Sequence, residues 1–377
     1  SLETFAVLCL GVIAVFKIYY HLVAAPMPDE AYYWLWGQHL DWSYFDHPPL
    51  QAWEQAAFSA MFGNSLFVLR LPALLSTLGI AAVVLWWARE ARLAGHPVPP
   101  ALALAVWFTS PVMFIFTTVV FPDHLAILLL SASTAMFFVV LDTVAWHGRL
   151  RVGLLYGAAL LLGLAMLTKY NSALVGAALA VAIVAYPPFR PLLRSPHLYL
   201  AAVLSLACLL PVLWWNVVND WASFQFHLSE RLDERMEAWR IADNLWSFLA
   251  NIVLGTSLFL VAAMVTMATR RASTTWLANW RVVALSTLLV PTLFWIGFSL
   301  ATRPAGYWNV VAYVVFLPLA VLWFPRRWLV VAHLVWGMCL SAIHVVNYTV
   351  LPLSLVVGSP DAEAEGMYGW SEIVASI

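Results

Sequence analysis

Long apolar segments recur along most of this chain, and they constrain its fold more than any other feature. Each contains roughly 17 to 25 residues with few charges, the length that a helix needs to cross a bilayer. They lie approximately at 4–24, 64–88, 98–117, 122–145, 152–168, 170–187, 197–217, 246–268, 283–301, 307–324 and 329–349. The runs are continuous and do not alternate with period two, which favours helices over the strands of a membrane barrel. We therefore predict an all-α, polytopic integral membrane protein with about eleven transmembrane helices.

The composition agrees with this class and excludes a water-soluble enzyme. Hydrophobic residues make up 63% of the 377 residues and charged residues only 10%. The net charge is −1 and no Lys/Arg-rich tract is present, so we expect no nucleic-acid partner. The three cysteines, Cys9, Cys208 and Cys339, lie in apolar runs and do not indicate disulfides. The first run has neither a basic segment before it nor a cleavage site, so we expect a retained helix and not a signal peptide.

Charged residues divide unequally between alternate connections, which predicts the orientation of the chain. Eleven of the 18 Lys and Arg residues fall on one side, which the positive-inside rule identifies as cytoplasmic. They are Arg89, Arg92, Arg149, Arg151, Arg190, Arg194, Arg270, Arg271, Arg281, Arg326 and Arg327. Sixteen of the 19 acidic residues fall on the other side. An odd number of spans, with the N-terminus inside and the C-terminus outside, fits both counts.

Three segments on the acidic side are longer than turns: 25–63, 218–245 and the tail 350–377. We expect two short interfacial helices in the first, because AYYWLWGQHL and PLQAWEQAAFSAMF each combine aromatic residues and Leu with a polar face. None of the three has the size and polarity of a separate soluble domain. We therefore predict a single domain over 1–377.

The first of these segments begins with candidate catalytic residues. Asp29 and Glu30 follow the first span, and aromatic residues that include Tyr33 surround them. Partial desolvation at a membrane boundary raises the pKa of a carboxylate and makes it a competent general base. The alternative is a set of solvated acids within an interfacial aromatic belt.

The same segment continues with Asp46 and His47, which precede two prolines. Each proline ring fixes its own φ and restricts the residue before it, so the two side chains are held in a defined direction. His47 is suited to donating a hydrogen bond to a phosphate or to carrying a proton. Alternatively, it only caps a helix that begins at Pro49.

Three more charged residues stand at the ends of apolar runs. Asp123 occupies a tight turn, Lys169 precedes Tyr170 between two runs, and Arg303 lies shortly before Tyr307. A charge at such a depth is a candidate for function, since it is costly unless paired. An ammonium or guanidinium group beside aromatic rings suits a phosphate and a sugar ring. A helix cap for Asp123, snorkelling of Lys169 and interface anchoring by Arg303 are the alternatives.

In the 218–245 segment, His227, Arg231 and Arg235 are candidates for closing over the site, although a solvated helix of mixed charge explains them as well. Carboxylates, cations and aromatic residues thus gather on one face of the membrane. This combination suits a lipid-linked anionic donor whose phosphate is held by cations while a carboxylate activates an acceptor hydroxyl. We find no paired Cys/His metal motif and expect no certain cofactor. Asp29 and Asp123 would be ligands of a divalent ion if they converge with Glu30 and His47.

Five motifs carry a resemblance to a known family. They are D-E-x-x-Y from Asp29, F-D-H-P-P-L from Phe45, G-N-S-x-F-x-x-R-L-P from Gly63, P-D at Pro122, and G-L-A-x-L-T-K from Gly163. Over 25–310 the chain resembles bacterial C-type glycosyltransferases, the group of the protein O-mannosyltransferases and the lipid A aminoarabinose transferases. The resemblance implies transfer of a sugar from a polyprenyl-phosphate donor, with inversion, on the periplasmic face of the bacterial inner membrane. The implied acceptor is a glycolipid such as lipid A, or a protein hydroxyl.

The resemblance also implies roles for particular residues. Asp29 matches the loop acid of the family, with Glu30 and Tyr33 beside it, and Asp123 matches the acid of the next external turn. Asp46 and His47 fall where aminoarabinose transferases carry Glu-Lys. Two departures, His47 in place of that lysine and Tyr32 in place of an arginine, suggest that the cationic role has moved to Lys169 or Arg303. We also expect no counterpart of the larger C-terminal periplasmic domain of longer relatives, so that the 218–245 segment or the bilayer would serve acceptor recognition.

Two other classes of protein fit a polytopic bundle with buried charges. A transporter or flippase for lipid-linked sugars is the first, but its charges would be expected near the midplane and an inverted repeat is not visible. A non-catalytic scaffold is the second, and it would not require carboxylates with aromatic walls in two separate loops. The transferase hypothesis therefore fits the sequence best.

Overall fold

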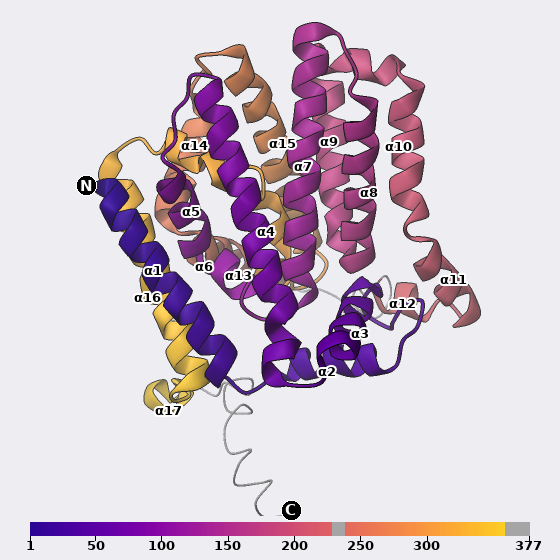
Figure 1. The fold of residues 1–377 in the computed structure, drawn as a ribbon, viewed down its shortest axis with the longest axis vertical. Coiled ribbons are helices and arrows are strands. Elements are labelled where there is room, and N and C mark those ends of the chain that lie inside the picture. Colours follow the sequence, from indigo (N-terminus) through magenta and orange to yellow (C-terminus); the bar gives the residue numbers. More distant parts are fainter. Residues whose placement is uncertain (228–237, 359–377) are drawn as a thin grey trace, which may run out of the picture.

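The computed structural model describes residues 1–227 and 238–358, and these ranges contain helices and no strand (Figure 1). The α-helices are α1 (Leu2–Val23), α2 (Pro28–Gln38), α3 (Leu50–Phe62), α4 (Leu66–Leu93), α5 (Pro100–Thr109), α6 (Pro111–Phe116), α7 (Pro122–His147), α8 (Val152–Thr168), α9 (Ala173–Ala185), α10 (Pro196–Ala207), α11 (Leu210–Val218), α12 (Ala222–Gln225), α13 (Ala238–Thr256), α14 (Leu258–Thr269), α15 (Thr275–Phe298), α16 (Arg327–Thr349) and α17 (Ser354–Val357). The 3₁₀-helices are η1 (Tyr170–Ser172), η2 (Pro187–Arg194), η4 (Gly306–Tyr313) and η5 (Leu317–Trp323). The predicted all-α membrane architecture is confirmed.

Among the described residues, five helices are long and apolar enough to cross a membrane: α1, α4, α7, α15 and α16. Four bent pairs raise this number to nine if each pair forms one span. The shorter apolar helices α5 and α8 account for two more of the predicted segments. The predicted total of eleven spans stays a prediction, because length and composition alone do not decide how a bent pair crosses the bilayer.

The apolar run at 246–268 is not the single straight span that its hydropathy suggested. Helices α13 and α14 meet at Ser257 with a bend of 95°. Ser257 has a φ of 84°, which is unusual for a residue other than glycine. Its hydroxyl accepts a hydrogen bond from the Leu260 amide (3.1 Å) and lies 2.7 Å from His333 Nδ1. A buried side chain on α16 therefore supports the break, and apolar composition carries no sign of it.

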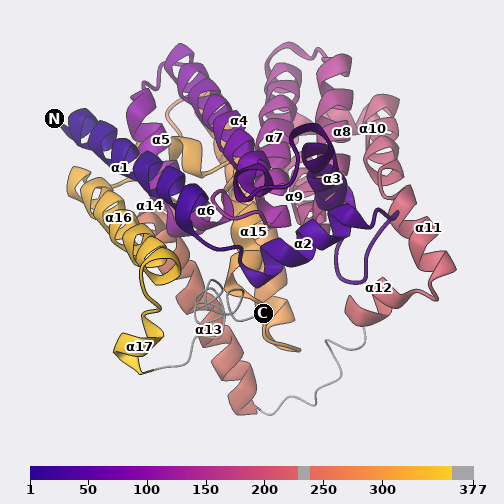
Figure 2. The same cartoon turned by 60° about the horizontal axis from the view of Figure 1, so that its bottom comes forward.

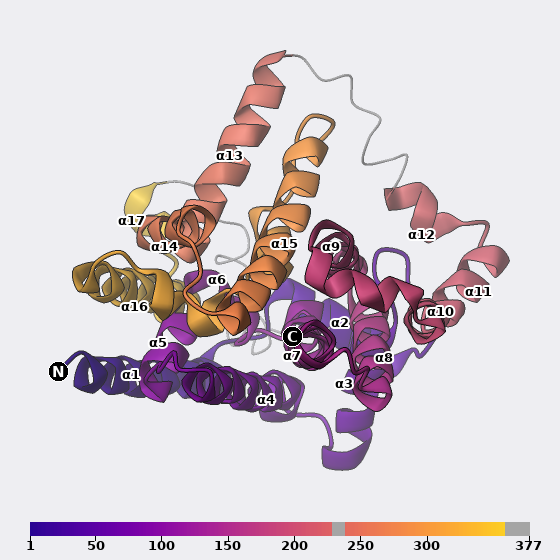
Figure 3. The same cartoon turned by 90° about the horizontal axis from the view of Figure 1, so that it is seen from above.

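Seen from above, the helices of the bundle form two groups that lie side by side (Figure 3). Helix α1 contacts α5 and α16, and α7 lies between α4 and α8. On the other side α8 contacts α10, and α9 contacts α15. The approach of α16 to α5 requires Gly337, because a Cβ at this position would overlap the Thr109 carbonyl oxygen.

The first long connection crosses one end of the bundle (Figures 1 and 2). The two interfacial helices expected there are present as α2 and α3, and α3 packs against both α2 and the start of α4. The connections α4–α5, α7–α8, α9–α10 and α14–α15 lie together at the opposite end (Figure 1). With the helix ends beside them, they carry eight of the eleven arginines predicted to be cytoplasmic. The acids of the first connection are thus separated from these basic turns by the length of the bundle.

Candidate active site

A fully buried ion pair fixes the start of the first connection. The Arg70 Nη2 atom lies 2.6 Å from Glu30 Oε2, and both side chains are shielded completely from solvent. Arg70 Nε donates to Glu30 Oε1 at 3.0 Å. The remaining Arg70 N–H groups donate to the carbonyls of Tyr20, Ala24 and Ala25. Arg70 on α4 therefore ties the end of α1 to the beginning of α2.

The carboxylate of Glu30 accepts two further hydrogen bonds from the backbone. The Met27 amide donates to Oε2 and the Val120 amide donates to Oε1, each at 3.0 Å. The Val120 contact reaches the buried turn that leads into Asp123. With four donors around it, Glu30 has no oxygen left for an acceptor hydroxyl. These contacts favour a structural role over the catalytic role predicted for this residue.

Asp29, one position earlier in the first turn of α2, has the opposite environment. Its side chain is exposed and lines a large, mostly apolar cavity. Partial burial raises the pKa of Asp29; His47 opposes the rise, and the carboxylates of Asp46 and Glu30 add to it. Solvent screens part of these effects because the residue is exposed. Asp29 is thus a free carboxylate beside a cavity, with a basicity greater than that of an ordinary aspartate.

Asp123 and Lys169 form a second ion pair. Lys169 Nζ lies 2.7 Å from both carboxylate oxygens of Asp123, and both residues are buried. The same ammonium lies 4.8 Å from the centre of the Tyr307 ring, a second favourable contact for a cation. Residues predicted from three separate positions in the chain therefore meet here.

Tyr33 lies at the centre of the candidate residues. Burial raises the pKa of its hydroxyl well above the ordinary value, and Asp29, Tyr307 and Asp123 add to the rise. The ring packs edge-on against His47, with centroids 5.5 Å apart. We call Asp29, Tyr33, Asp123, Lys169 and Tyr307 the acid–aromatic cluster. Tyr33 remains protonated within it and can donate a hydrogen bond.

Asp46 and His47 flank this cluster. Burial alone would raise the pKa of Asp46, but His47, with its Nδ1 3.2 Å away, and the Tyr32 hydroxyl together hold it below the ordinary value. Tyr170 packs edge-on against His227, whose Nε2 lies 3.1 Å from the Asp46 carbonyl oxygen. The segment before α13 therefore reaches the first connection through His227. The predicted Arg231 and Arg235 lie outside the described residues.

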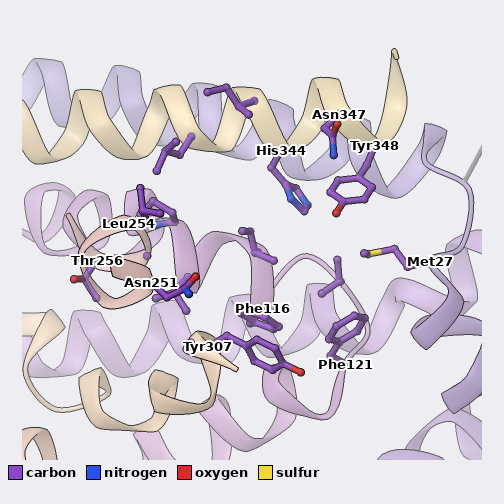
Figure 4. A pocket seen from close by; sticks show the side chains of 18 of the residues that line it. Met27, Phe116, Phe121, Asn251, Leu254, Thr256, Tyr307, His344, Asn347 and Tyr348 are labelled. Carbon is purple, nitrogen blue, oxygen red and sulfur yellow. The ribbon is translucent and has the colours of Figure 1, made fainter. Parts of the chain in front are cut away.

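The cavity beside Asp29 has a volume of about 810 Å³ and a mostly apolar lining (Figure 4). Its walls come from the start of α2 and from α6, α13, η4, α16 and α17. Figure 4 shows Phe116 and Tyr307 along one wall and His344, Asn347 and Tyr348 along the opposite one. Tyr307 belongs both to the cavity and to the acid–aromatic cluster. This volume is in the range of known ligand sites.

Two predictions about cations and metals do not match the geometry. Arg303 contacts α13 instead of a cluster residue: its Nη2 donates to Ser247 Oγ at 2.9 Å, Asp243 lies 3.8 Å from Nη1, and its side chain is 64% exposed. A metal site at Asp29 and Asp123 is not formed either. Nowhere in 1–227 and 238–358 do three possible metal ligands lie together, and the ammonium of Lys169 already covers both oxygens of Asp123.

Sequence reasoning missed a partly buried acid on α3, Glu54. Burial raises the pKa of Glu54, on α3, to about 8. Its Oε2 finds no hydrogen-bond partner in the described part of the chain and lies 3.6 Å from His124 Nε2, while His124 Nδ1 lies 2.9 Å from Ser76 Oγ. Sequence reasoning also assigned no role to Arg70. A single arginine at the start of an apolar run is costly unless it is paired, and this cost could have indicated that Arg70 has a buried partner.

The sequence comparisons agree with this picture over part of the chain. The family model "Dolichyl-phosphate-mannose-protein mannosyltransferase" matches residues 46–215. The chain is 32% identical to lipid A galacturonosyltransferase RgtD of Rhizobium johnstonii over 196 residues, which is 51% of this chain and 38% of that protein. It is 26% identical over 186 residues to the undecaprenyl phosphate-alpha-4-amino-4-deoxy-L-arabinose arabinosyl transferase of Edwardsiella ictaluri, covering 45% of this chain and 33% of the relative. The matched segments thus span 38% and 33% of these curated relatives.

The structural comparison extends over nearly the whole chain. Crystal structures of ArnT from Cupriavidus metallidurans match 96% of it with 19% identity. The TM-score is 0.62 for the apo state, covering 66% of that chain, and 0.63 for the state bound to undecaprenyl phosphate, covering 67%. The resemblance to C-type glycosyltransferases is confirmed, and the fold is that of ArnT.

Proposed function

We propose that this chain, which has the membrane fold of the C-type glycosyltransferases, is an inverting transferase that uses a polyprenyl-phosphate sugar as donor. The observation that carries the proposal is the place of Asp29. A free carboxylate with a raised pKa stands where a large apolar cavity meets the acid–aromatic cluster. A lipid-linked donor needs this combination, because its chain requires apolar walls while its reacting end requires charge and hydrogen bonds.

In the proposed reaction Asp29 is the general base. The acceptor hydroxyl gives its proton to the Asp29 carboxylate while its oxygen forms a bond to the anomeric carbon. The bond from that carbon to the phosphate oxygen breaks, and polyprenyl phosphate leaves with the bonding electrons. Attack opposite the leaving group inverts the anomeric carbon.

The leaving phosphate requires positive charge, and Lys169 is our candidate for this role. An ammonium has three N–H groups. The two carboxylate oxygens of Asp123 accept hydrogen bonds from two of them, which leaves one N–H for a phosphate oxygen. Tyr33 supplies a protonated hydroxyl from the same cluster, and His47 stands beside its ring. The ion pair with Asp123 holds the Lys169 side chain in place before the donor arrives.

We place the enzyme in the bacterial inner membrane with the site on the periplasmic face, N-terminus inside and C-terminus outside. The concentration of arginines at the end of the bundle opposite α2 supports this orientation. For the acceptor we favour a glycolipid of the lipid A type over a protein, because the relative RgtD is by its name a lipid A galacturonosyltransferase. The name of the other curated relative gives an undecaprenyl-phosphate sugar as its donor.

The test is transfer by purified protein from a radiolabelled undecaprenyl-phosphate sugar to lipid A. Substitution of Asp29 by Asn keeps the size and removes the base, so transfer should fall roughly 100- to 10,000-fold. Asp220, at the start of the next external segment, gives a matched Asp→Asn control that should retain wild-type rates. Undiminished transfer by the Asp29 variant at normal protein levels would exclude Asp29 as the base, and no transfer by the wild type with any sugar donor would count against the proposed function.

A further inference from the structure

One histidine in the cavity wall is not accounted for by the proposed reaction. His344 points from α16 into the cavity, on the wall opposite Tyr307 (Figure 4). Its Nε2 is buried and has no hydrogen-bond partner within the described residues. A polar atom in this position is costly unless something satisfies it, so it points to a ligand group.

The imidazole ring is held in place by aromatic neighbours. It stacks on Tyr20 with centroids 5.5 Å apart and packs edge-on against Phe114 at 6.2 Å. The Tyr348 ring lies 4.7 Å away on the same helix. With three rings around it, His344 cannot readily turn its Nε2 elsewhere, and the ring is pre-oriented toward the cavity.

The other polar groups on this wall show which ligand chemistry fits. Asn347 and Tyr348 flank His344 on α16, and Asn347 is fixed because its Oδ1 accepts from the Leu353 amide at 2.8 Å. No lysine or arginine belongs to the described residues that line the cavity. A phosphate would therefore find no counter-charge on this wall, whereas hydroxyl groups suit an imidazole, an amide and a phenol.

We infer that His344 is a sugar-binding residue: its Nε2 hydrogen-bonds a hydroxyl group of a lipid-borne sugar that enters the cavity, next to Asn347 and Tyr348. The inference rests on the proposed function, since it assigns a subsite to the same cavity. It adds a recognition wall on α16, across the cavity from Tyr307 and apart from the Lys169 phosphate position. The sugar belongs either to the donor or to the glycolipid acceptor, and these two sources are separable by binding.

The experiment compares three lipids that differ in their sugar: undecaprenyl phosphate without sugar, an undecaprenyl-phosphate sugar, and lipid A. Their dissociation constants are measured for the wild type and for His344→Phe, which retains a ring for Tyr20 and Phe114 but has no Nε2. Loss of one neutral hydrogen bond should weaken binding of a sugar-bearing lipid roughly three- to tenfold. Undecaprenyl phosphate should bind as before. If the variant binds the undecaprenyl-phosphate sugar more weakly, the ligand of His344 is the donor sugar. If it binds lipid A more weakly, the ligand is the sugar of the acceptor.

Two variants serve as controls. His344→Gln retains a hydrogen-bonding end and should recover part of the affinity, while Leu340→Val changes an apolar residue of the same wall and should leave the preference for sugar-bearing lipids unchanged. If His344→Phe does not fold, His344→Asn gives the same comparison, because its amide is too short to reach the same position. Unchanged affinity for both sugar-bearing lipids, or an equal loss for undecaprenyl phosphate, would overturn the inference. If the wild type transfers sugar and the His344 variants bind all three lipids normally, only this inference fails.

Discussion

Replacing Glu30 by Gln tests whether this residue holds the site together or takes part in the chemistry. The amide has the same shape but offers one oxygen instead of two. One of the two donor pairs, Arg70 Nε with the Val120 amide or Arg70 Nη2 with the Met27 amide, would then face an NH₂ group. Two buried donors without acceptors cost about 1–3 kcal/mol each, and the guanidinium also loses its counter-charge. We expect a loss of about 3–5 kcal/mol, the usual cost of breaking a buried pair from one side.

The assay is thermal unfolding of the purified protein in detergent, together with sugar transfer well below the unfolding temperature. The double variant Glu30→Gln with Arg70→Met removes the unpaired charge and should be more stable than Glu30→Gln alone. Glu90→Gln is a matched control, since the Arg89–Glu90 pair is exposed and contributes roughly 0–1 kcal/mol. If Glu30→Gln unfolds like the wild type but transfers no sugar, the structural reading is wrong and the carboxylate belongs to the chemistry.

Three other perturbations have defined outcomes. Lys169→Met should cost about 3–5 kcal/mol because it leaves Asp123 buried and unpaired. The double variant with Asp123→Asn should recover stability but not donor affinity, and wild-type affinity in that double variant would remove the phosphate role of Lys169. The pKa of Glu54 is about 8 when folded and near 4.5 when unfolded, so between these values only the folded state keeps the proton. Stability should therefore fall by at most about 1.4 kcal/mol per pH unit as pH rises from 4.5 to 8, and Glu54→Gln should abolish this slope, as unfolding temperatures across that range would show. Arg303→Gln should change stability by less than about 1 kcal/mol and leave transfer unchanged, because its ion pair is exposed, and a large loss of donor binding would restore the earlier assignment.

Sequence reasoning located most members of the candidate site without showing how they are connected. Asp29, Asp123 and Lys169 stood out because charge is rare in apolar runs. Their partners did not, because Lys169 and Asp123 are 46 residues apart and Arg70 and Glu30 are 40 apart. Which charge neutralises which depends on the packing of helices, and a single sequence does not contain that information directly.

The same limit explains the residues that were placed differently. Arg303 and Lys169 have similar local contexts, each a single cation between apolar runs with an aromatic residue nearby. Only the packing of η1 and α15 gives the two cations different environments. Lys169 is buried against Asp123, whereas Arg303 is exposed beside Ser247. The cavity and the orientation of His344 were also beyond prediction, because their walls come from segments spread from Met27 to Val357.

The sequence alone determined that this chain forms membrane helices, that the acids of the first connection lie away from the arginine-bearing turns, and that the first connection is itself helical. These properties follow from local composition, because lipid requires each backbone group to be satisfied within its own segment. The tertiary structure decided which of the two adjacent acids, Asp29 and Glu30, is held by hydrogen bonds and which faces the cavity. Glu30 points into the protein, where Arg70 and two backbone amides occupy it, and Asp29 faces the cavity. Neighbouring residues on a helix point about 100° apart, and only the packing around the helix gives each direction its environment.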